Sequence, residues 1–98
     1  MQMYVTEFGI FDSPGEPPSQ EQIELCKRWL AQFAEPGKRI NWRSNSYMCK
    51  HDVEAWANTY VANGAFIQAA IDSGFRWRRA SNTSHNAEFA MKIRRERG

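Results

Sequence analysis

The sequence has no long apolar run, few cysteines and no basic N-terminal segment. No stretch approaches the roughly 18 consecutive apolar residues of a transmembrane helix, so we expect no membrane span. The opening residues, MQMYVTEFGIF, contain neither Lys nor Arg and so lack the basic start of a signal peptide. Cys26 and Cys49 fall at apolar helical positions, where we expect small buried side chains and no disulfide. We therefore expect a cytoplasmic protein that makes no contact with membranes.

Catalytic and metal-binding motifs are equally scarce. The two histidines, His51 and His85, form no Cys/His pair with zinc spacing. The sequence has no Gly-rich phosphate loop, and no Ser/His/Asp or Cys/His order that is typical of nucleophilic enzymes. His51 adjoins Lys50 and Asp52, but adjacent residues on a helix point in different directions. We therefore expect no enzyme, no cofactor and no metal.

The chain does have enough apolar material for one compact domain, and its charge is uneven. Of its 98 residues, 42% are hydrophobic, which argues against a globally disordered chain. Residues 1–35 hold two cations against six carboxylates, whereas residues 76–98 hold seven cations against two. An acidic front and a basic back suit a polyanionic partner. A solvated surface with a basic tail fits the same distribution.

The first third of the chain divides into an arm and a helix. Residues 4–11, YVTEFGIF, are rich in β-forming residues and predict a short strand or an extended arm. Pro and Gly in the next residues predict a turn, so we assign residues 1–18 to an N-terminal arm or linker. Ser19 and Gln22 have the spacing of a capping box, and apolar residues then recur at helical spacing. We expect a helix over residues 19–34.

A short strand and a second helix are expected next. Ile40 and Trp42 alternate with polar residues over residues 39–43, which predicts a short amphipathic strand with Ile40 and Trp42 on its inward, apolar face. Ser44 or Ser46 is expected to cap the helix that follows. The buried stripe of this helix is expected to contain Cys49, Val53, Trp56, Ala57 and Tyr60. Its opposite face is expected to expose Lys50, His51, Asp52 and Glu54.

The last part of the chain predicts a third helix and a hairpin. Asn63 is a favourable N-cap for a helix over residues 63–73, and Gly74 suits the left-handed position after its end. The period then changes from 3.6 to 2, as Phe75 and Trp77 alternate with arginines. A second alternating run follows the polar loop SNTSHN and contains Ala87, Phe89, Met91 and Ile93. Two such runs around a polar loop predict a β-hairpin.

This order of elements predicts an α+β fold with three helices, a short strand and a C-terminal β-hairpin. It matches a winged helix-turn-helix domain, in which the hairpin is the wing. The strand at residues 39–43 would pair with the hairpin, since an isolated hairpin is only marginally stable in water. We place the winged-helix-like domain at residues 19–93 and a basic tail at residues 94–98.

The candidate binding residues lie on the third helix, the wing and the tail. Gln68 can read adenine bidentately, and Asn63 lies at the start of the same helix. This helix carries Asp72 and neither Lys nor Arg, so its use for core packing is an open alternative. The wing and the tail are expected to supply Arg76, Trp77, Arg78, Arg79, His85, Arg94 and Arg95 as phosphate or partner contacts.

One stretch, with a short continuation in the hairpin, resembles a known group of sequences. Its residues are Ser46, Tyr47, Lys50, His51, Val53, Glu54, Tyr60, Val61, residues 63–67 (NGAFI), Ala69, Ala70, Gly74, Phe75, Asn86, Ala87 and Phe89. This pattern resembles small uncharacterised proteins of phages and plasmids in proteobacteria, and residues 1–43 take no part in it. Met48, Cys49 and Glu88 depart from the usual residues of that family but leave the packing pattern intact. The resemblance implies a mobile-element origin and a bacterial host.

Two kinds of partner follow from these observations. The first is DNA, expected as duplex, bound by a small phage or mobile-element protein through a basic wing. The second is a host defence complex, bound by a phage-encoded inhibitor of the anti-CRISPR type. The inhibitor hypothesis draws on the arginines and tryptophans, because both residue types are enriched at interface hot spots. The sequence leaves the oligomeric state open.

Overall fold

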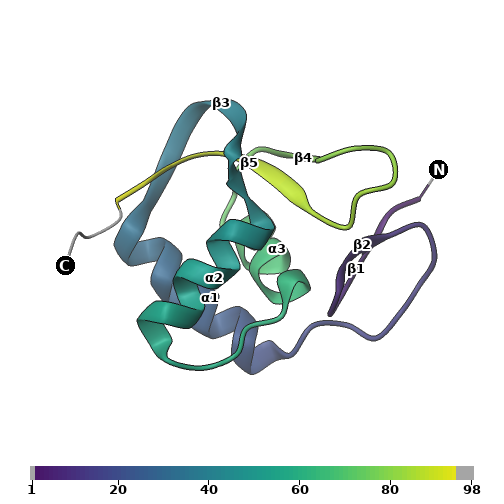
Figure 1. Ribbon diagram of the computed structural model, residues 1–98, viewed down its shortest axis with the longest axis horizontal. Helices are drawn as coiled ribbons and strands as arrows, with labels where there is room; N and C mark the ends of the chain where they lie inside the picture. Colours follow the sequence, from purple (N-terminus) through teal and green to yellow (C-terminus); the bar gives the residue numbers. More distant parts are fainter. Residues whose placement is uncertain (1, 95–98) are drawn as a thin grey trace.

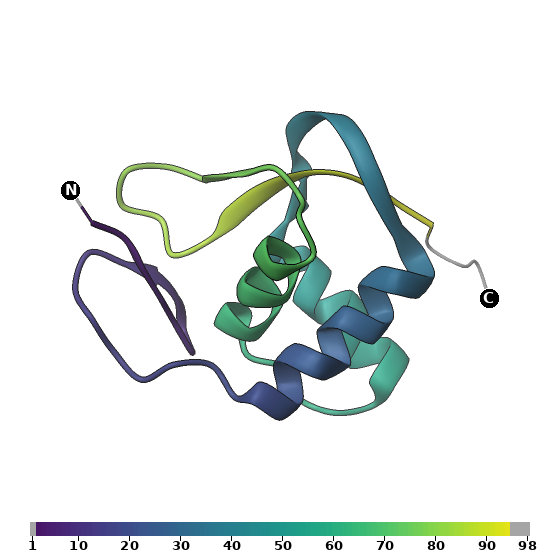
Figure 2. The ribbon, with the colours of Figure 1, turned by 180° about the vertical axis from the view of Figure 1, so that it is seen from behind.

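The protein has an α+β fold in which three helices pack against a small sheet. A computed structural model describes residues 2–94. The elements are β1 (Tyr4–Thr6), β2 (Gly9–Phe11), α1 (Gln20–Phe33), β3 (Ala34–Asn45), α2 (Ser46–Ala57), α3 (Asn63–Asp72), β4 (Trp77–Arg79) and β5 (Ala87–Ile93). Figures 1 and 2 show the helices on one side of the sheet formed by β3, β4 and β5. The predicted α+β class, with three helices and a C-terminal hairpin, is confirmed.

Helix α1 forms where the capping box and apolar spacing predict it. The Ser19 hydroxyl accepts a hydrogen bond from the Gln22 N–H at 3.3 Å. The buried face of α1 packs against α3, and the ring centroids of Trp29 and Phe66 lie 5.9 Å apart. Phe66 in turn lies 5.8 Å from Phe89 of β5, again between centroids. These three aromatic side chains therefore join both helices and the sheet in one core.

Asn45 caps α2, so the prediction that Ser44 or Ser46 does so is wrong. The Asn45 side-chain oxygen accepts from the Met48 N–H at 2.9 Å, as an N-cap residue does. The Ser44 hydroxyl instead donates to the Met91 carbonyl, and the Ser46 hydroxyl accepts from the Ala87 N–H, each at 3.1 Å. Both serines are buried, and they fasten the start of α2 to β5.

Helix α3 lies at the centre of the molecule. It contacts α1, α2 and both N-terminal strands, and residues 61–67 are all buried. Gly74 has a φ of 88° just after the helix, which confirms the predicted left-handed end. The expected helix boundaries are nearly correct, but Asn63 is the first helical residue and Ala62 occupies the N-cap position.

The C-terminal hairpin joins β3 in an antiparallel sheet of order β3-β5-β4. Strand β3 has 12 residues, so it is much longer than the strand predicted at residues 39–43. Its register against β5 is irregular, because Pro36 pairs with Met91, Asn41 with Phe89 and Asn45 with Glu88. The surplus residues of β3 rise beyond the helices and return to α2 (Figures 1 and 2). We call residues 37–44 the β3 arch.

The N-terminal segment, expected as an arm or linker, contains a hairpin that docks on α3. Strands β1 and β2 pair antiparallel, and Ile10 is fully buried in the main core. The Gly64 N–H donates to the Glu7 carbonyl at 3.1 Å, and a Cβ at position 64 would overlap the Thr6 carbonyl oxygen. Glycine at position 64 therefore permits the close approach of the hairpin. No helix within residues 2–94 has the length and apolar character needed to span a bilayer.

Candidate nucleic-acid interface

The start of α3 is enclosed and does not present a surface to a partner. Asn63 is only 9% exposed, and its side-chain nitrogen donates to the His85 carbonyl at 3.2 Å and the Asn86 side-chain oxygen at 2.9 Å. The same nitrogen lies 3.4 Å from the Phe8 carbonyl. Asn63 therefore connects the N-terminal hairpin, α3 and the loop between β4 and β5, and its side-chain nitrogen is used for contacts within the fold.

Gln68 is half-buried and already has a partner on its own helix. Its side-chain nitrogen donates to the Asp72 carboxylate at 2.8 Å. Asp72 also pairs with Lys27 of α1 at 3.4 Å. Burial lowers the Lys27 pKa, but hydrogen bonds and charges from Asp72 and Glu24 outweigh it and raise the pKa overall. Most side chains of α3 are buried in the core, which supports the alternative that this helix serves core packing.

Two of the predicted wing residues hold the N-terminal hairpin in place. The Arg79 guanidinium donates to the Asp12 carboxylate at 2.7 Å and to the Ser84 carbonyl at 2.6 Å, with its side chain 11% exposed. The His85 ring stacks on Phe11, with centroids 4.0 Å apart and planes 15° apart. Arg79 and His85 thus have internal roles that account for their positions.

Trp77 and Arg94 are also partly committed to the fold. Trp77 pairs with Phe89 across β4 and β5 and packs, partly buried, against the core. The Arg94 guanidinium is exposed and donates to the Gln32 carbonyl at 2.8 Å. Arg95 lies outside the described residues, so its predicted role is untouched by the structure.

Arg76 and Arg78 are exposed cations of the C-terminal hairpin, residues 76–93, for which we use the word wing as a label only. The Arg76 guanidinium donates to the Lys38 carbonyl of the β3 arch at 2.7 Å. Arg78, whose side chain is 59% exposed, pairs with Glu88 at 2.9 Å. The wing and the β3 arch therefore adjoin, and Arg76 joins them.

The β3 arch carries a cluster of cations around a tryptophan, where the alternation of residues predicts only a plain strand. Lys38, Arg39 and Arg43 are exposed, and Trp42 is 62% exposed, so the prediction that Trp42 faces inward with Ile40 is wrong. The Arg43 guanidinium carbon lies 5.3 Å from the Trp42 ring centroid, within cation–π range. The sequence signal was present as three cations and a tryptophan in KRINWR.

Local hydrogen bonds fix the shape of the β3 arch. The Asn41 side-chain oxygen accepts from the Ser44 N–H at 3.1 Å. The Asn45 side-chain nitrogen donates to the Trp42 carbonyl at 2.8 Å. These contacts hold the exposed segment in a turn without burying its cations. We define the arch–wing surface as Lys38, Arg39, Trp42, Arg43, Arg76 and Arg78.

A second exposed surface lies on α2 and the residues after it. Trp56 is 40% exposed and Tyr60 is 63% exposed, so their placement in a buried stripe is wrong. Tyr47 and Met48, at 52% and 43%, are exposed on the first turn of the same helix. Tyr47 and Tyr60 both lie over Lys50, and we call these two side chains and the adjacent Met48 the α2 aromatic face. Trp56 lies on the other side of the helix, edge-on to Phe33 of α1. Exposed Tyr and Met side chains are enriched at protein-binding surfaces.

Lys50 lies beneath the rings of Tyr47 and Tyr60, contrary to the expectation that it faces away from the core. It is 8% exposed, and its ammonium nitrogen lies 5.6 Å and 5.2 Å from the ring centroids of Tyr47 and Tyr60. The same nitrogen is 3.4 Å from the Glu54 carboxylate. The ammonium charge of Lys50 thus compensates the negative charge of Glu54 at the junction between α2 and α3.

Glu54 holds that junction together. Its carboxylate accepts from the Val61 N–H at 2.9 Å and lies 2.8 Å from the His51 ring nitrogen. Burial raises the Glu54 pKa, but the Val61 hydrogen bond, the Lys50 charge and the His51 contact outweigh it and lower the pKa overall. His51 therefore contacts a carboxylate that is already used for structure.

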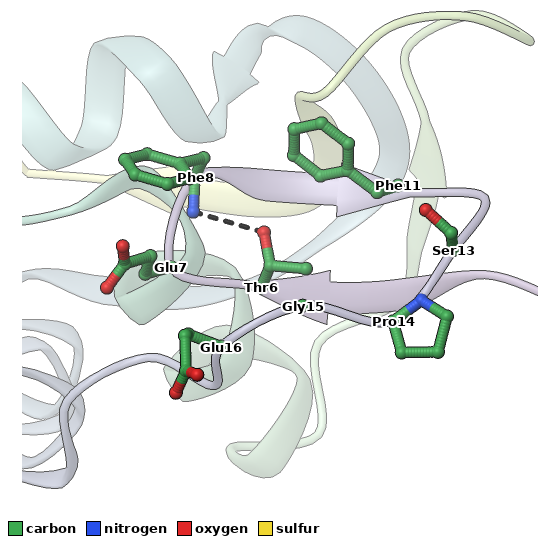
Figure 3. Close-up of a pocket in the computed structure, with 8 residues that line it drawn as sticks. All are labelled: Thr6, Glu7, Phe8, Phe11, Ser13, Pro14, Gly15 and Glu16. Atoms are coloured by element: carbon green, nitrogen blue, oxygen red, sulfur yellow. Dashed lines mark hydrogen bonds between the residues drawn. The ribbon is translucent and has the colours of Figure 1, made fainter.

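A small pocket lies between the N-terminal hairpin and the segment after it (Figure 3). It has a volume of about 170 Å³, and its lining residues are Thr6, Glu7, Phe8, Phe11, Ser13, Pro14, Gly15 and Glu16. The lining holds two carboxylates and no cation, so it does not suit a phosphate. Within residues 2–94 no group of three or more His, Cys, Asp or Glu residues is placed to hold a metal ion.

Comparison of the chain with protein-family models, with curated proteins and with solved structures finds no match in any of the three.

Proposed function

We propose that the protein binds nucleic acid through the arch–wing surface and contacts chiefly its phosphate backbone. The observation that carries this proposal is the set of five exposed cations on two adjoining segments. The five are Lys38, Arg39, Arg43, Arg76 and Arg78. Glu88, which pairs with Arg78, is largely buried and offsets only one of these charges. A cationic surface of this kind binds phosphates and releases their counterions.

The fold is, on this proposal, a winged-helix-like domain that does not use its third helix as a reader. The order of elements and the pairing of β3 with the last strand support the winged arrangement. The N-terminal hairpin covers the start of α3, where such domains contact base edges. Fold does not fix function, so the contact surface can move to the wing and the β3 arch.

Weak sequence preference follows from this geometry. Phosphate contacts position a nucleic acid but carry no sequence information directly. The α3 side chain proposed to read adenine, Gln68, is bonded to Asp72. Affinity should therefore vary little among oligonucleotides of equal length and different sequence.

A salt series with fluorescently labelled oligonucleotides tests the proposal. The variant Arg39→Ala/Arg43→Ala/Arg76→Ala removes three cations from the arch–wing surface. The slope of log affinity against log salt is negative, and each lost phosphate contact reduces its magnitude by about 0.7 for a single strand or about 0.9 for a duplex. The magnitude should therefore fall by about 2–3. Arg28→Ala, at an exposed position of α1 outside that surface, is the matched control and should change neither slope nor affinity.

Two outcomes would overturn the proposal. One is the absence of binding to both single strands and duplexes at 50 mM salt. The other is an equal loss of affinity in the triple variant and in Arg28→Ala, because that result would reflect net charge and not a defined surface. Circular dichroism of each variant verifies that the fold is retained.

A second candidate function is inhibition of a host defence complex, and the α2 aromatic face favours it. Tyr, Trp and Met are enriched at protein interfaces, and aromatic side chains often carry most of the binding energy. The resemblance to phage and plasmid proteins suggests an anti-CRISPR type of target. Co-purification with a defence complex that is lost in Tyr47→Ala/Met48→Ala, but kept in the triple arginine variant, would support inhibition over nucleic-acid binding.

A further inference from the structure

Trp42 is the feature of the arch–wing surface that charge alone does not explain. It is 62% exposed at a position flanked by Arg43 and close in sequence to Arg39. An indole exposed to this degree forgoes the free energy of burial and leaves a flat aromatic ring accessible to a ligand. Trp29, by comparison, is 3% exposed in the core.

We propose that the arch–wing surface prefers single-stranded nucleic acid and that an unpaired base stacks on the Trp42 ring. This inference rests on the proposed function and names its substrate class. Bases in a duplex are stacked on one another, so an exposed indole reaches a base face only where the strand is unpaired. Cationic grooves combined with aromatic platforms are the usual means of binding single strands without sequence preference.

The geometry around Trp42 suits such a platform. The Arg43 guanidinium carbon lies 5.3 Å from the ring centroid, where it stabilises the ring orientation by a cation–π contact. The Trp42 carbonyl is held by the Asn45 side chain at 2.8 Å, which limits rotation of the backbone. A ring held in this way loses little conformational entropy when a base stacks on it.

The neighbouring cations can contact the phosphates of the nucleic acid on both sides of the stacked base. Lys38 and Arg39 precede the tryptophan on the β3 arch, and Arg43 follows it. The Arg76 side chain reaches the Lys38 carbonyl, which extends the positive surface onto the wing. The enclosure of α3 also disfavours a duplex, because the helix that would enter a major groove is covered by the N-terminal hairpin.

The test measures affinity for a mixed-sequence single strand, for the same strand in a duplex, and for an abasic single strand with equal phosphates. The single strand should bind most tightly. Trp42→Ala should weaken single-strand binding about 5- to 150-fold and should bind the abasic and normal strands equally. Trp42→Phe should restore part of the affinity, because phenylalanine retains a stacking face. Trp56→Ala removes another exposed tryptophan and should leave affinity unchanged.

The outcomes separate this inference from the proposed function. Equal or tighter binding of the duplex, together with an unchanged affinity for Trp42→Ala, would overturn the single-strand inference while phosphate binding stands. Equal binding of normal and abasic strands by the wild type would also overturn it. Absence of binding to all three ligands would overturn both proposals at once.

Discussion

Gly64 is the residue at which the hairpin and α3 come closest, and it makes the docking testable. Alanine there would overlap the Thr6 carbonyl oxygen, so Gly64→Ala should displace the hairpin and destabilise the fold by about 1–3 kcal/mol. Hydrogen exchange should show faster exchange of the Ile10 amide, which donates to the His85 carbonyl. Gly74→Ala, with open space around its Cβ, is the control. It should lower stability through its positive φ but leave Ile10 protected; loss of protection in both variants would contradict the docking contact.

Glu54 makes stability depend on pH. Because its pKa is lowered in the folded state, its contribution is present above the unfolded pKa and is lost as the pH falls through the folded pKa. Glu54→Gln should therefore be less stable than the wild type at neutral pH. The difference should shrink below about pH 4, near the ordinary pKa of Glu. Urea unfolding at pH 7 and pH 3 measures it; a difference that grows toward acid would contradict the assignment.

At the scale of elements, the two arginines of β4 differ in role: Arg79 anchors the N-terminal hairpin, whereas Arg78 is exposed. Arg79→Ala removes charge-assisted contacts to Asp12 and Ser84, and should lower the free energy of unfolding by about 1.5–3 kcal/mol. Arg78→Ala removes a single ion pair between the exposed Arg78 and the largely buried Glu88, and should cost about 1 kcal/mol. Equal losses in urea unfolding would show that this division of the wing is incorrect. In binding assays the order should reverse, with Arg78→Ala the weaker binder.

Local patterns in the sequence predicted most elements, because each depends on neighbouring residues. The periods of 3.6 and 2 predicted three helices and the C-terminal hairpin. The N-terminal hairpin escaped prediction because β1 and β2 have only three residues each and gain stability from α3. The β3 arch escaped it because register irregularities against β5 depend on a distant strand.

The candidate site was predicted only in part for the same reason. The exposure of Arg76 and Arg78 could be predicted, since alternation places them on the outer face of the C-terminal hairpin. The enclosure of Asn63 could not be inferred, because it depends on the hairpin formed by β1 and β2. A strict period of 2 predicts that Trp42 lies on the buried face with Ile40. Trp42 is exposed because this period does not hold through an arch.

At the scale of the whole molecule, five exposed cations gather with Trp42 on the arch–wing surface, while Tyr47 and Met48 are exposed on α2. The arch–wing surface is cationic and extends from β3 to β4, whereas the α2 aromatic face exposes apolar side chains. The small net charge of +2 therefore conceals a local positive field, which is what a polyanion encounters. Nucleic acid and a protein partner can, on this arrangement, be tested separately by variants of one surface.

The most direct test of the central claim is NMR mapping of backbone amides during titration with a short single-stranded oligonucleotide. We predict that shifts concentrate in residues 37–45 and 76–79, and that α3 amides from residue 63 to residue 72 remain near their free positions. Shifts centred on α3, or on the α2 aromatic face with the β3 arch unaffected, would contradict the account.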